Sequence, residues 1–600
     1  MINDYFRKKL TQIESDASQI QAYNSKGNTV VMAGPGSGKT TVLTLKVMKL
    51  LSEEIRPPRG LACLTYSREA TREFQHRLKL MGLVRRRHAV FLGTVHSFCL
   101  SEVLIPFSKL YPEYNIPYPI KIISNSEKKA LFQNVKNSVR EEHLNMEEMD
   151  KERTRYISGF SKVVIPSYDA ALKAAVLFEN ELSRNGYIDY ISMVKDATSL
   201  IQNEEYVQKA LEAKFPWLII DEYQDLGKPL HEMVLGLLHK TNIKIFAVGD
   251  ADQSIYDFQG ASPEYLIELS QWRSIQNRIS LIFNYRSAKE IVEASEIVLN
   301  EKRDYIAKGE LRDYHASIDF FVCEEGMTDQ YNKTIELIKE YLAAGVALHE
   351  IAVLAGYQNN LREFSQVCIA NGIPYYLARL DFDRSEFIKW LENCATWVLD
   401  PTGVSFDEIF VYWESFLKNH GTKIMHKTRI FYKRELYDVL WSSIHYESTL
   451  SKWLQNVIDC LNIENLLNNS IFYPDELSNL NKLKEMLGTH PYDHYNLNNF
   501  IRLGVPENQV VLSTRHGAKG LEFDVVILLG MEKDSFPRYN SNMREIAEAH
   551  RLCFVSVSRA RKKCILLRSN YLNIPTRHGE VWRKRCEPSP FWNMLYSRNL

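Results

Sequence analysis

The stretch TVVMAGPGSGKTT, from Thr29 to Thr41, constrains the fold of this chain more than any other. Its first four residues are β-branched or apolar, which suits a buried strand of a parallel sheet. Turn-forming residues follow, and then Lys39 and Thr40 open a helical pattern. This order aims backbone N–H groups and a helix N-terminus at one point, which creates an anion site. The stretch therefore predicts an α/β fold around a phosphate-binding loop.

The residues of this loop suit a nucleotide. Glycines let the backbone approach a phosphate chain closely. Lys39 reaches the β- and γ-phosphates, and the Thr40 hydroxyl ligates Mg²⁺. A turn without a nucleotide is the weaker alternative, because motif and context agree. We therefore expect ATP to bind the whole loop, which comprises Ala33 (a tolerated variant of the usual glycine), Gly34, Pro35, Gly36, Ser37, Gly38, Lys39, Thr40 and Thr41.

Length, charge and cysteine content narrow the class of protein. A chain of 600 residues is too long for a single hydrophobic core, so we expect about three or four subdomains. Lys+Arg and Asp+Glu both number 74, so net charge gives no argument for nucleic acid. The nine cysteines form no C-x-x-C pair, which fits a reduced cytoplasmic protein. No apolar run reaches the ~18 residues that span a bilayer, so we expect no membrane partner.

A pair of carboxylates follows a predicted buried strand within FPWLIIDEYQDL, residues 215–226. Asp221 and Glu222 are adjacent there, and two buried carboxylates need a compensating cation or proton. In a chain with a phosphate loop, Mg²⁺ is the natural cation. The sequence therefore predicts Asp221 as the Mg²⁺ ligand and Glu222 as the residue that orients the attacking water.

Three further segments suit contacts with ATP. Gln253 follows a strand that begins near residue 243, and its amide can rotate between partners when the γ-phosphate leaves. Tyr285 suits stacking on adenine, and Arg286 suits a phosphate contact. Arg559 lies near a helix end and suits the role of an arginine finger. A cation that serves the helix dipole is the alternative for Arg559.

Other polar and aromatic residues lie just beyond strand ends, where open α/β sheets bind ligands. Such hydroxyls and rings suit phosphate contacts and base stacking. Ordinary strand-end caps and core aromatics are the alternatives. The residues that we predict on this basis to contact nucleic acid are Thr65, Tyr66, Thr94, His96, Tyr256 and Phe258.

Two long stretches, 101–214 and 386–500, lose the sheet pattern and are predicted to be helical insertions. The tryptophans of the second insertion are most simply core residues: Trp390, Trp397, Trp413, Trp441 and Trp453. Residues 423–434, KIMHKTRIFYKR, are basic with interleaved aromatics. This segment suits either contact with the phosphate backbone of a duplex or, as the better interpretation, a solvent-exposed helix face.

Together these motifs resemble the UvrD/Rep-like branch of superfamily 1 helicases. Their order and spacing match over nearly the whole chain, whereas the two helical stretches are less diagnostic. The motifs are Gln19 with Ala22, AGPGSGKT, LTYSREA, GTVHSF, IIDEYQD, VGDADQSIYDFQGA, NYRS, IAVL with GIPY, STRHGAKGLEF, GMEKDSFP and RLCFVSVSRA. A P-loop kinase or transporter ATPase needs neither NYRS nor GAKGLEF, so both classes are excluded.

The resemblance implies two RecA-like domains with parallel sheets, each carrying a largely helical insertion, and ATP with Mg²⁺ between the domains. The first domain would comprise 1–100 and 215–276, with its insertion at 101–214. The second would comprise 277–385 and 501–600, with its insertion at 386–500. The resemblance further implies that Gln19 reads adenine, that the ATP site also includes Gly520 and Glu522, and that Thr514 and His516 join the DNA contacts.

Family members move 3′-to-5′ along one strand, so the resemblance implies an ATP-dependent DNA translocase and helicase that acts on single strands and junctions. The chain departs from the common pattern at Gly356 and Gln259, where arginine is frequent, at Phe258 and at Ser558. These departures concern DNA coupling more than ATP hydrolysis. The alternative is therefore an ATP-gated DNA-sensing subunit of a repair or anti-phage defence complex, with a nuclease or other protein partner.

Overall fold

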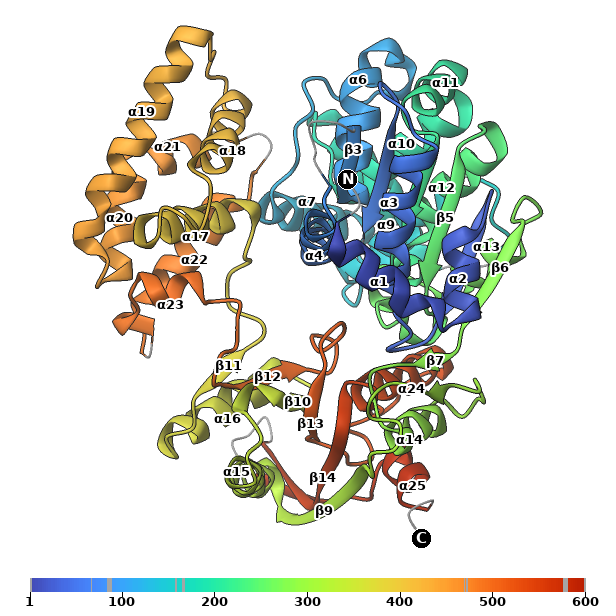
Figure 1. The fold of residues 1–600 in the computed structure, drawn as a ribbon, viewed down its shortest axis with the longest axis vertical. Coiled ribbons are helices and arrows are strands. Elements are labelled where there is room, and N and C mark those ends of the chain that lie inside the picture. The colour runs from blue at the N-terminus through green and yellow to red at the C-terminus, as the bar shows by residue number, and fades with distance from the viewer. Residues whose placement is uncertain are drawn as a thin grey trace.

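The computed structural model describes residues 3–65, 67–83, 89–156, 159–163, 168–468, 470, 473–490, 492–575 and 581–597 of the chain. Two separate sheets of mainly parallel strands are covered by helices, and a third, purely helical lobe stands beside them (Figure 1). This arrangement confirms the predicted α/β class. Within the described ranges, no helix is long and apolar enough to cross a membrane.

The first sheet has the strand order β3-β2-β4-β5-β1-β6, with all neighbours parallel. Its strands are apolar on both faces because helices cover both: Val30 belongs to one core and Val31 to the other. The strands are β1 (Thr29–Ala33), β2 (Gly60–Thr65), β3 (Ala89–Thr94), β4 (Trp217–Ile220), β5 (Lys244–Gly249) and β6 (Asn277–Leu281). The covering helices are α1 (Asp4–Glu14), α2 (Ala17–Asn24), α3 (Lys39–Glu53), α4 (Arg68–Leu80), α12 (Lys228–Lys240) and α13 (Pro263–Gln271).

Strand β6 corrects the predicted domain boundary. The sequence analysis began the second domain at residue 277, but β6 pairs in parallel with β1, with Asn277 opposite Thr29. The helix α13 carries the chain back across the sheet, so β6 becomes an edge strand of the first sheet. The first sheet therefore continues through Leu281, whose carbonyl accepts the N–H of Gly34 in the phosphate loop (3.2 Å).

The second sheet has the order β11-β12-β10-β13-β14-β15, with β9 also paired to β14. Among the described strand pairs of this sheet, β14–β15 is antiparallel and the others are parallel. The strands are β9 (Ser317–Glu325), β10 (Ile351–Ala355), β11 (Tyr375–Leu377), β12 (Val510–Thr514), β13 (Phe523–Leu528), β14 (Ala560–Pro575) and β15 (Val581–Arg585). The flanking helices are α14 (Lys289–Leu299), α15 (Gly326–Ala343), α16 (Gln358–Ala370), α24 (Met543–Val557) and α25 (Pro590–Tyr596). A short pair, β7 (Phe283–Asn284) and β8 (Ile306–Ala307), joins the two domains.

Helices dominate both predicted insertions. The first contains α7 (Asn125–Val139), α8 (Met146–Arg153), α9 (Asp169–Arg184), α10 (Tyr190–Asn203) and α11 (Glu205–Lys214). The second contains α17 (Glu386–Leu399), α18 (Phe406–Asn419), α19 (His426–Ser442), α20 (Leu450–Cys460), α21 (Ile463–Asn468), α22 (Glu476–Leu487) and α23 (Leu497–Ile501). Four of the five tryptophans predicted as core are buried in the second insertion, but Trp441 is 59% exposed. The outward face of α19 carries Trp441, so that prediction is wrong for this residue.

A buried ion pair holds the first insertion together. The Arg153 guanidinium on α8 is fully buried and donates two parallel hydrogen bonds of 2.7 Å to Asp189, the N-cap residue of α10. Lys128 lies 2.9 Å from the same carboxylate. Burial alone would raise the pKa of Asp189, but Arg153 and Lys128 hold it well below its usual range.

We expect Asp189→Asn to lower the free energy of unfolding by about 3–5 kcal/mol, because the buried Arg153 guanidinium then loses the negative charge of its bidentate partner. The folded-state pKa of Asp189 is depressed, so this contribution is complete above its unfolded pKa of about 3.9 and is lost as the pH falls towards the folded value. Urea unfolding followed by circular dichroism measures the change. Asp313→Asn, in an exposed ion pair with Arg312, serves as the control. Equal stability of both variants would contradict the role of the pair.

Candidate nucleotide site and nucleic-acid cavity

The phosphate loop folds as predicted between β1 and α3. Gly36 and Gly38 have φ values of 66° and 80°, in the left-handed region that favours glycine. A Cβ at Gly36 would lie 2.6 Å from Asn284 Oδ1, so the loop lies against the segment that follows the first sheet. Lys39 begins α3 directly after Gly38. The backbone N–H groups of the first turn of α3 are therefore available to an anion.

The predicted carboxylate pair lies at the end of β4, beside Lys39. Glu222 has a φ of 51°, and its Oε1 lies 4.0 Å from Lys39 Nζ. Burial raises the pKa of Glu222, but the charges of Lys39 and Lys519 and a hydrogen bond from Gln224 together outweigh it and lower the pKa to about 2. Burial and the neighbouring Glu222 charge raise the pKa of Asp221 to about 7. Glu222 is therefore the ionised member of the pair.

Asp221 fits a divalent cation. Its side chain is buried, and its Oδ1 accepts the N–H of Glu222 at 2.9 Å. Across the described part of the chain, no lysine, arginine or histidine forms an ion pair with Asp221. A buried carboxylate of this kind is costly unless a proton or a cation compensates its charge.

Two arginines approach the loop from beyond the first sheet. Arg286 donates from Nε to Glu522, while its Nη1 is buried without a hydrogen-bond partner among the described residues. Arg559 is 1% exposed, and its hydrogen bonds to described residues all go to neutral oxygens: the carbonyls of Val555 and Leu521 and the Ser558 hydroxyl. Burial and the Arg286 charge lower the pKa of Arg559 to about 9. Both guanidinium groups therefore lack a full set of anionic partners next to the phosphate loop.

The remaining predicted ATP residues contact the loop or its neighbours. Gln19 is buried and donates from Nε2 to the Ser37 carbonyl (2.7 Å). Tyr285 donates its backbone N–H to the Gly36 carbonyl and its hydroxyl to Asp16, both at 2.9 Å. Gln253 donates from Nε2 to Asp250 (2.6 Å) at the end of β5. Gly520 has a φ of 87° in the turn that leads to Glu522. Direct contacts of these residues with a nucleotide remain predictions.

Three ion pairs across the domain boundary were not predicted. Lys519 Nζ lies 2.6 Å from Asp225 and also donates to the Gln253 carbonyl (2.7 Å). The other two pairs are Arg303–Asp252 (2.7 Å) and Arg551–Asp257 (2.9 Å). Each pair joins a residue of the DEYQD or GDADQSIYDFQG segments to a cation from beyond the first sheet. No local pattern shows such pairing, because the partners are far apart in the chain.

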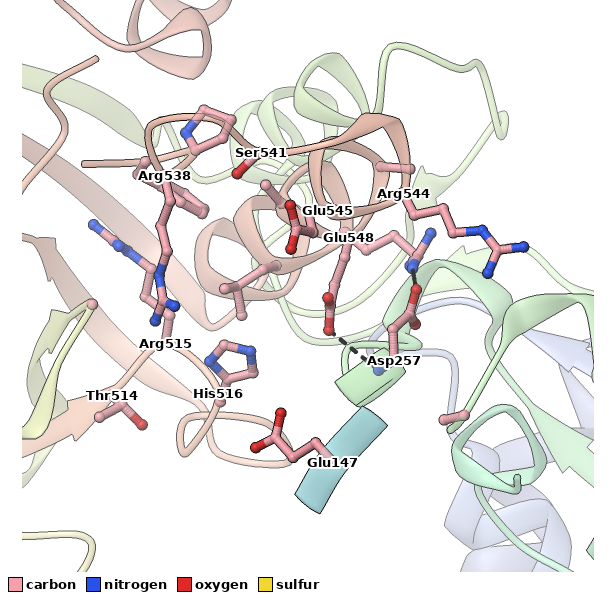
Figure 2. Close-up of a pocket in the computed structure, with 18 of the residues that line it drawn as sticks. Glu147, Asp257, Thr514, Arg515, His516, Arg538, Ser541, Arg544, Glu545 and Glu548 are labelled. Carbon is pink, nitrogen blue, oxygen red and sulfur yellow. Dashed lines mark hydrogen bonds and ion pairs between the residues drawn. The ribbon is translucent and has the colours of Figure 1, made fainter. Parts of the chain in front are cut away.

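A cavity of about 1280 Å³ lies between the first insertion and the two domains (Figure 2). Its walls come from α8, from residues 257–265 and from residues 514–516 and 535–552. Thr514 and His516, two of the predicted nucleic-acid residues, line it. Burial lowers the pKa of His516 to about 4, so this imidazole is neutral at pH 7. Cationic lining residues that the sequence analysis missed are Lys151, Arg362, Arg379, Lys482, Arg515, Arg538, Arg544 and Arg551.

The other predicted nucleic-acid residues lie elsewhere. Thr65 is buried and donates to the Ser67 carbonyl (2.9 Å). Thr94 caps the short helix that follows β3. Both threonines therefore act as strand-end caps, which was the alternative to a nucleic-acid contact. The His96 ring lies against Tyr190. Lys519 Nζ is 5.1 Å from the centre of the Tyr256 ring, which is partly buried in the domain boundary. Tyr66 and the side chain of Phe258 lie outside the described residues.

Comparisons with known proteins agree with this geometry. The UvrD/REP helicase N-terminal domain matches residues 15–272, and the UvrD-like helicase C-terminal domain matches residues 417–571. The ATP-dependent DNA helicase PcrA of Staphylococcus epidermidis is 24% identical over 89% of this chain and 80% of its own. The PcrA of Staphylococcus aureus is 25% identical with the same coverage. Both halves of the chain thus match one family, and the chain belongs to the UvrD/Rep-like superfamily 1 DNA helicases, in which two RecA-like domains form the core.

Proposed function

We propose that this chain is an ATP-driven translocase that moves 3′-to-5′ along single-stranded DNA and separates duplex ahead of it. The observation that carries the proposal is the convergence of two sets of groups at one place. The phosphate loop, Asp221 and Glu222 come from the first sheet, and Arg286 and Arg559 come from beyond it. Guanidinium groups with incomplete anionic partners beside a phosphate loop match the charge of a nucleotide triphosphate.

Each residue at this boundary has a distinct task in the proposal. Thr40 and Asp221 would hold Mg²⁺, which supplies charge neutralisation at the phosphates when bound. Lys39 binds the β- and γ-phosphates, and Glu222 accepts a proton from the attacking water because it is ionised. Arg286 and Arg559 bind the γ-phosphate from the second domain. Hydrolysis removes this shared anion, so the domains separate and close again with the next ATP.

The DNA strand would cross both domains through the cavity of Figure 2. Thr514 offers a hydroxyl there, and the neutral His516 offers a ring for stacking and one N–H donor. The arginines of the cavity wall provide charge for the backbone phosphates. A cavity that spans the domain boundary changes shape when the domains close, which couples ATP turnover to strand movement.

Steady-state ATP hydrolysis with and without oligo(dT) tests this proposal. We expect the oligonucleotide to raise the rate strongly in the wild-type chain and to have no effect in Lys39→Ala, which lacks the phosphate-binding ammonium. Strand displacement on duplexes with either a 3′ or a 5′ single-stranded tail then reports polarity. Absence of DNA stimulation in a folded wild-type chain, or unwinding from the 5′ tail alone, would refute the proposal.

One observation favours the second candidate, a partner-dependent DNA-sensing subunit. The outward face of α19 exposes Ile430, Phe431 and Trp441 by 64%, 62% and 59%. Large apolar side chains clustered on one solvent-facing helix are typical of protein interaction surfaces. The segment 423–434 contains five Lys and Arg residues and no acidic residue, so a partner with acidic character would suit it. Efficient unwinding by the isolated chain would count against this candidate, and unwinding only with a nuclease partner would favour it.

A further inference from the structure

A buried chain of hydrogen bonds begins at Tyr223, the residue that directly follows Glu222. Tyr223 and His231, which lies on α12, are both fully buried. The Tyr223 hydroxyl lies 2.8 Å from His231 Nδ1, and His231 Nε2 lies 3.0 Å from a carboxylate oxygen of Glu268 on α13. A carboxylate only accepts, so Nε2 is the donor, and Nδ1 of the neutral ring then accepts from the tyrosine. Two helices of the first domain thus hold the neighbour of Glu222.

The carboxylate of Glu268 is ionised and fixed at its other side. Burial raises its pKa, but hydrogen bonds from His231 and from segment 159–163 of the first insertion lower it to about 2. In that segment, Lys162 donates its backbone N–H at 2.7 Å and Ser161 donates its hydroxyl at 2.5 Å. Charge-assisted hydrogen bonds of this kind are among the stronger ones in proteins. The far end of the chain is therefore anchored, so His231 has a fixed support.

Glu222 needs support from its neighbours because its backbone is strained. Its φ and ψ are 51° and 47°, in the left-handed region that residues other than glycine rarely adopt. Such a conformation persists only where the surrounding contacts over-determine it. The short turn that follows begins with Tyr223, so the position of this side chain fixes how the backbone leaves Glu222. A change in that backbone would move the Glu222 carboxylate relative to Lys39 Nζ, which lies 4.0 Å away.

We propose that His231 and Glu268 are positioning residues for ATP hydrolysis, which lock the Tyr223 hydroxyl and thereby hold Glu222 in the orientation that activates water. This assignment rests on the proposed function, in which Glu222 accepts the proton of the attacking water. Hydrolysis depends on this alignment, since a displacement of about 1 Å at a reacting group can cost about 10²-fold in rate. Both positioning residues lie outside the motifs on which the family resemblance rests.

DNA-stimulated ATP hydrolysis by the full chain tests the pair. His231→Leu replaces the ring by an apolar side chain and removes both of its hydrogen bonds. We expect kcat to fall by roughly 10- to 10²-fold. The KM for ATP should stay nearly unchanged, because the phosphate loop is untouched. His231→Gln should recover most of kcat, since one amide can accept from Tyr223 and donate to Glu268.

A double variant separates positioning from general damage. Glu222→Gln lacks the carboxylate that is positioned, so adding His231→Leu to it should lower kcat no further. Glu268→Gln should lower kcat in the same direction as His231→Leu, because it removes the charge that orients the imidazole. His239→Gln is the matched control: His239 also lies on α12, but it is exposed and packs on the Phe160 ring (4.8 Å between ring centres). It should leave kcat unchanged.

The outcomes are distinguishable. A loss of kcat in His231→Leu that Gln recovers, and that disappears in the Glu222→Gln background, supports the inference. An unchanged kcat would overturn it, and an equal further loss in that background would assign His231 a purely structural role. If the folded wild-type chain does not hydrolyse ATP, the proposed function itself fails. Should His231→Leu not fold, as thermal unfolding reports, Tyr223→Phe takes its place: it removes a single hydroxyl, and the same loss of kcat is expected.

Discussion

Replacing Glu222 by Gln is expected to lower kcat for DNA-stimulated ATP hydrolysis by roughly 10²- to 10⁴-fold, the range for a lost general base. Glu222 is the ionised carboxylate of the pair, because Lys39, Lys519 and Gln224 together lower its pKa to about 2, whereas the pKa of Asp221 is raised to about 7. Gln has nearly the same shape but accepts no proton. ATP should therefore still bind while hydrolysis stops.

Two measurements make this prediction specific. Equilibrium binding of a fluorescent ATP analogue should change little, and single-turnover hydrolysis should show the loss. Glu54→Gln is a suitable control, since Glu54 lies just beyond the other end of α3 and contacts Trp217. If Glu222→Gln hydrolyses ATP at the wild-type rate, the water is activated by another group and the assignment is refuted.

Replacing Arg559 by Ala is expected to lower kcat by roughly 10³- to 10⁵-fold, as for other arginine fingers. Arg559 follows the C-terminal end of α24 and is anchored by carbonyls, so its charge is held in place before ATP binds. Such a group stabilises the charge that develops in the transition state without reorganisation. Affinity for ATP should change much less than kcat, because the contact strengthens in the transition state.

The alternative for Arg559, a cation that stabilises the helix dipole, makes a different prediction. Under this alternative, Arg559→Ala would lower the melting temperature but leave kcat within about tenfold of wild type, since a dipole contact is worth only about 0.3–1 kcal/mol. Kinetics and thermal unfolding of Arg559→Ala therefore decide between the two. Lys562→Ala is the control, because Lys562, at the start of β14, pairs with Asp524 of β13 (2.8 Å) and not with a residue of the phosphate loop.

Much of the fold and the nucleotide site could be predicted from the sequence. The strand, turn and helix around Lys39 are encoded within a few consecutive residues, and so is the carboxylate pair after β4. Both depend on local periodicity and on turn chemistry, which a single sequence shows directly. The cap at Asp16, which accepts the N–H groups of Ser18 and Gln19, is local in the same way, because aspartate is a preferred residue at the start of a helix.

The roles of strand-end side chains were harder to predict. Thr65 and His516 both follow a strand, yet the first is turned inward onto Ser67 and the second lines the cavity. A strand-end position specifies where the backbone leaves the sheet. It does not specify which neighbour a hydroxyl or ring will meet, because that neighbour comes from another part of the chain.

The sequence by itself determined the parallel α/β class, the phosphate loop and the identity of the family, because each is written in local patterns and in their order. Only the tertiary structure decided that β6 belongs to the first sheet, that Trp441 faces solvent, and that the Arg515 guanidinium packs against Gly356. These three results depend on strand pairing and side-chain packing between segments distant in the chain. Local propensity carries no information about such partners, since the free energy of each contact depends on what the rest of the fold brings beside it.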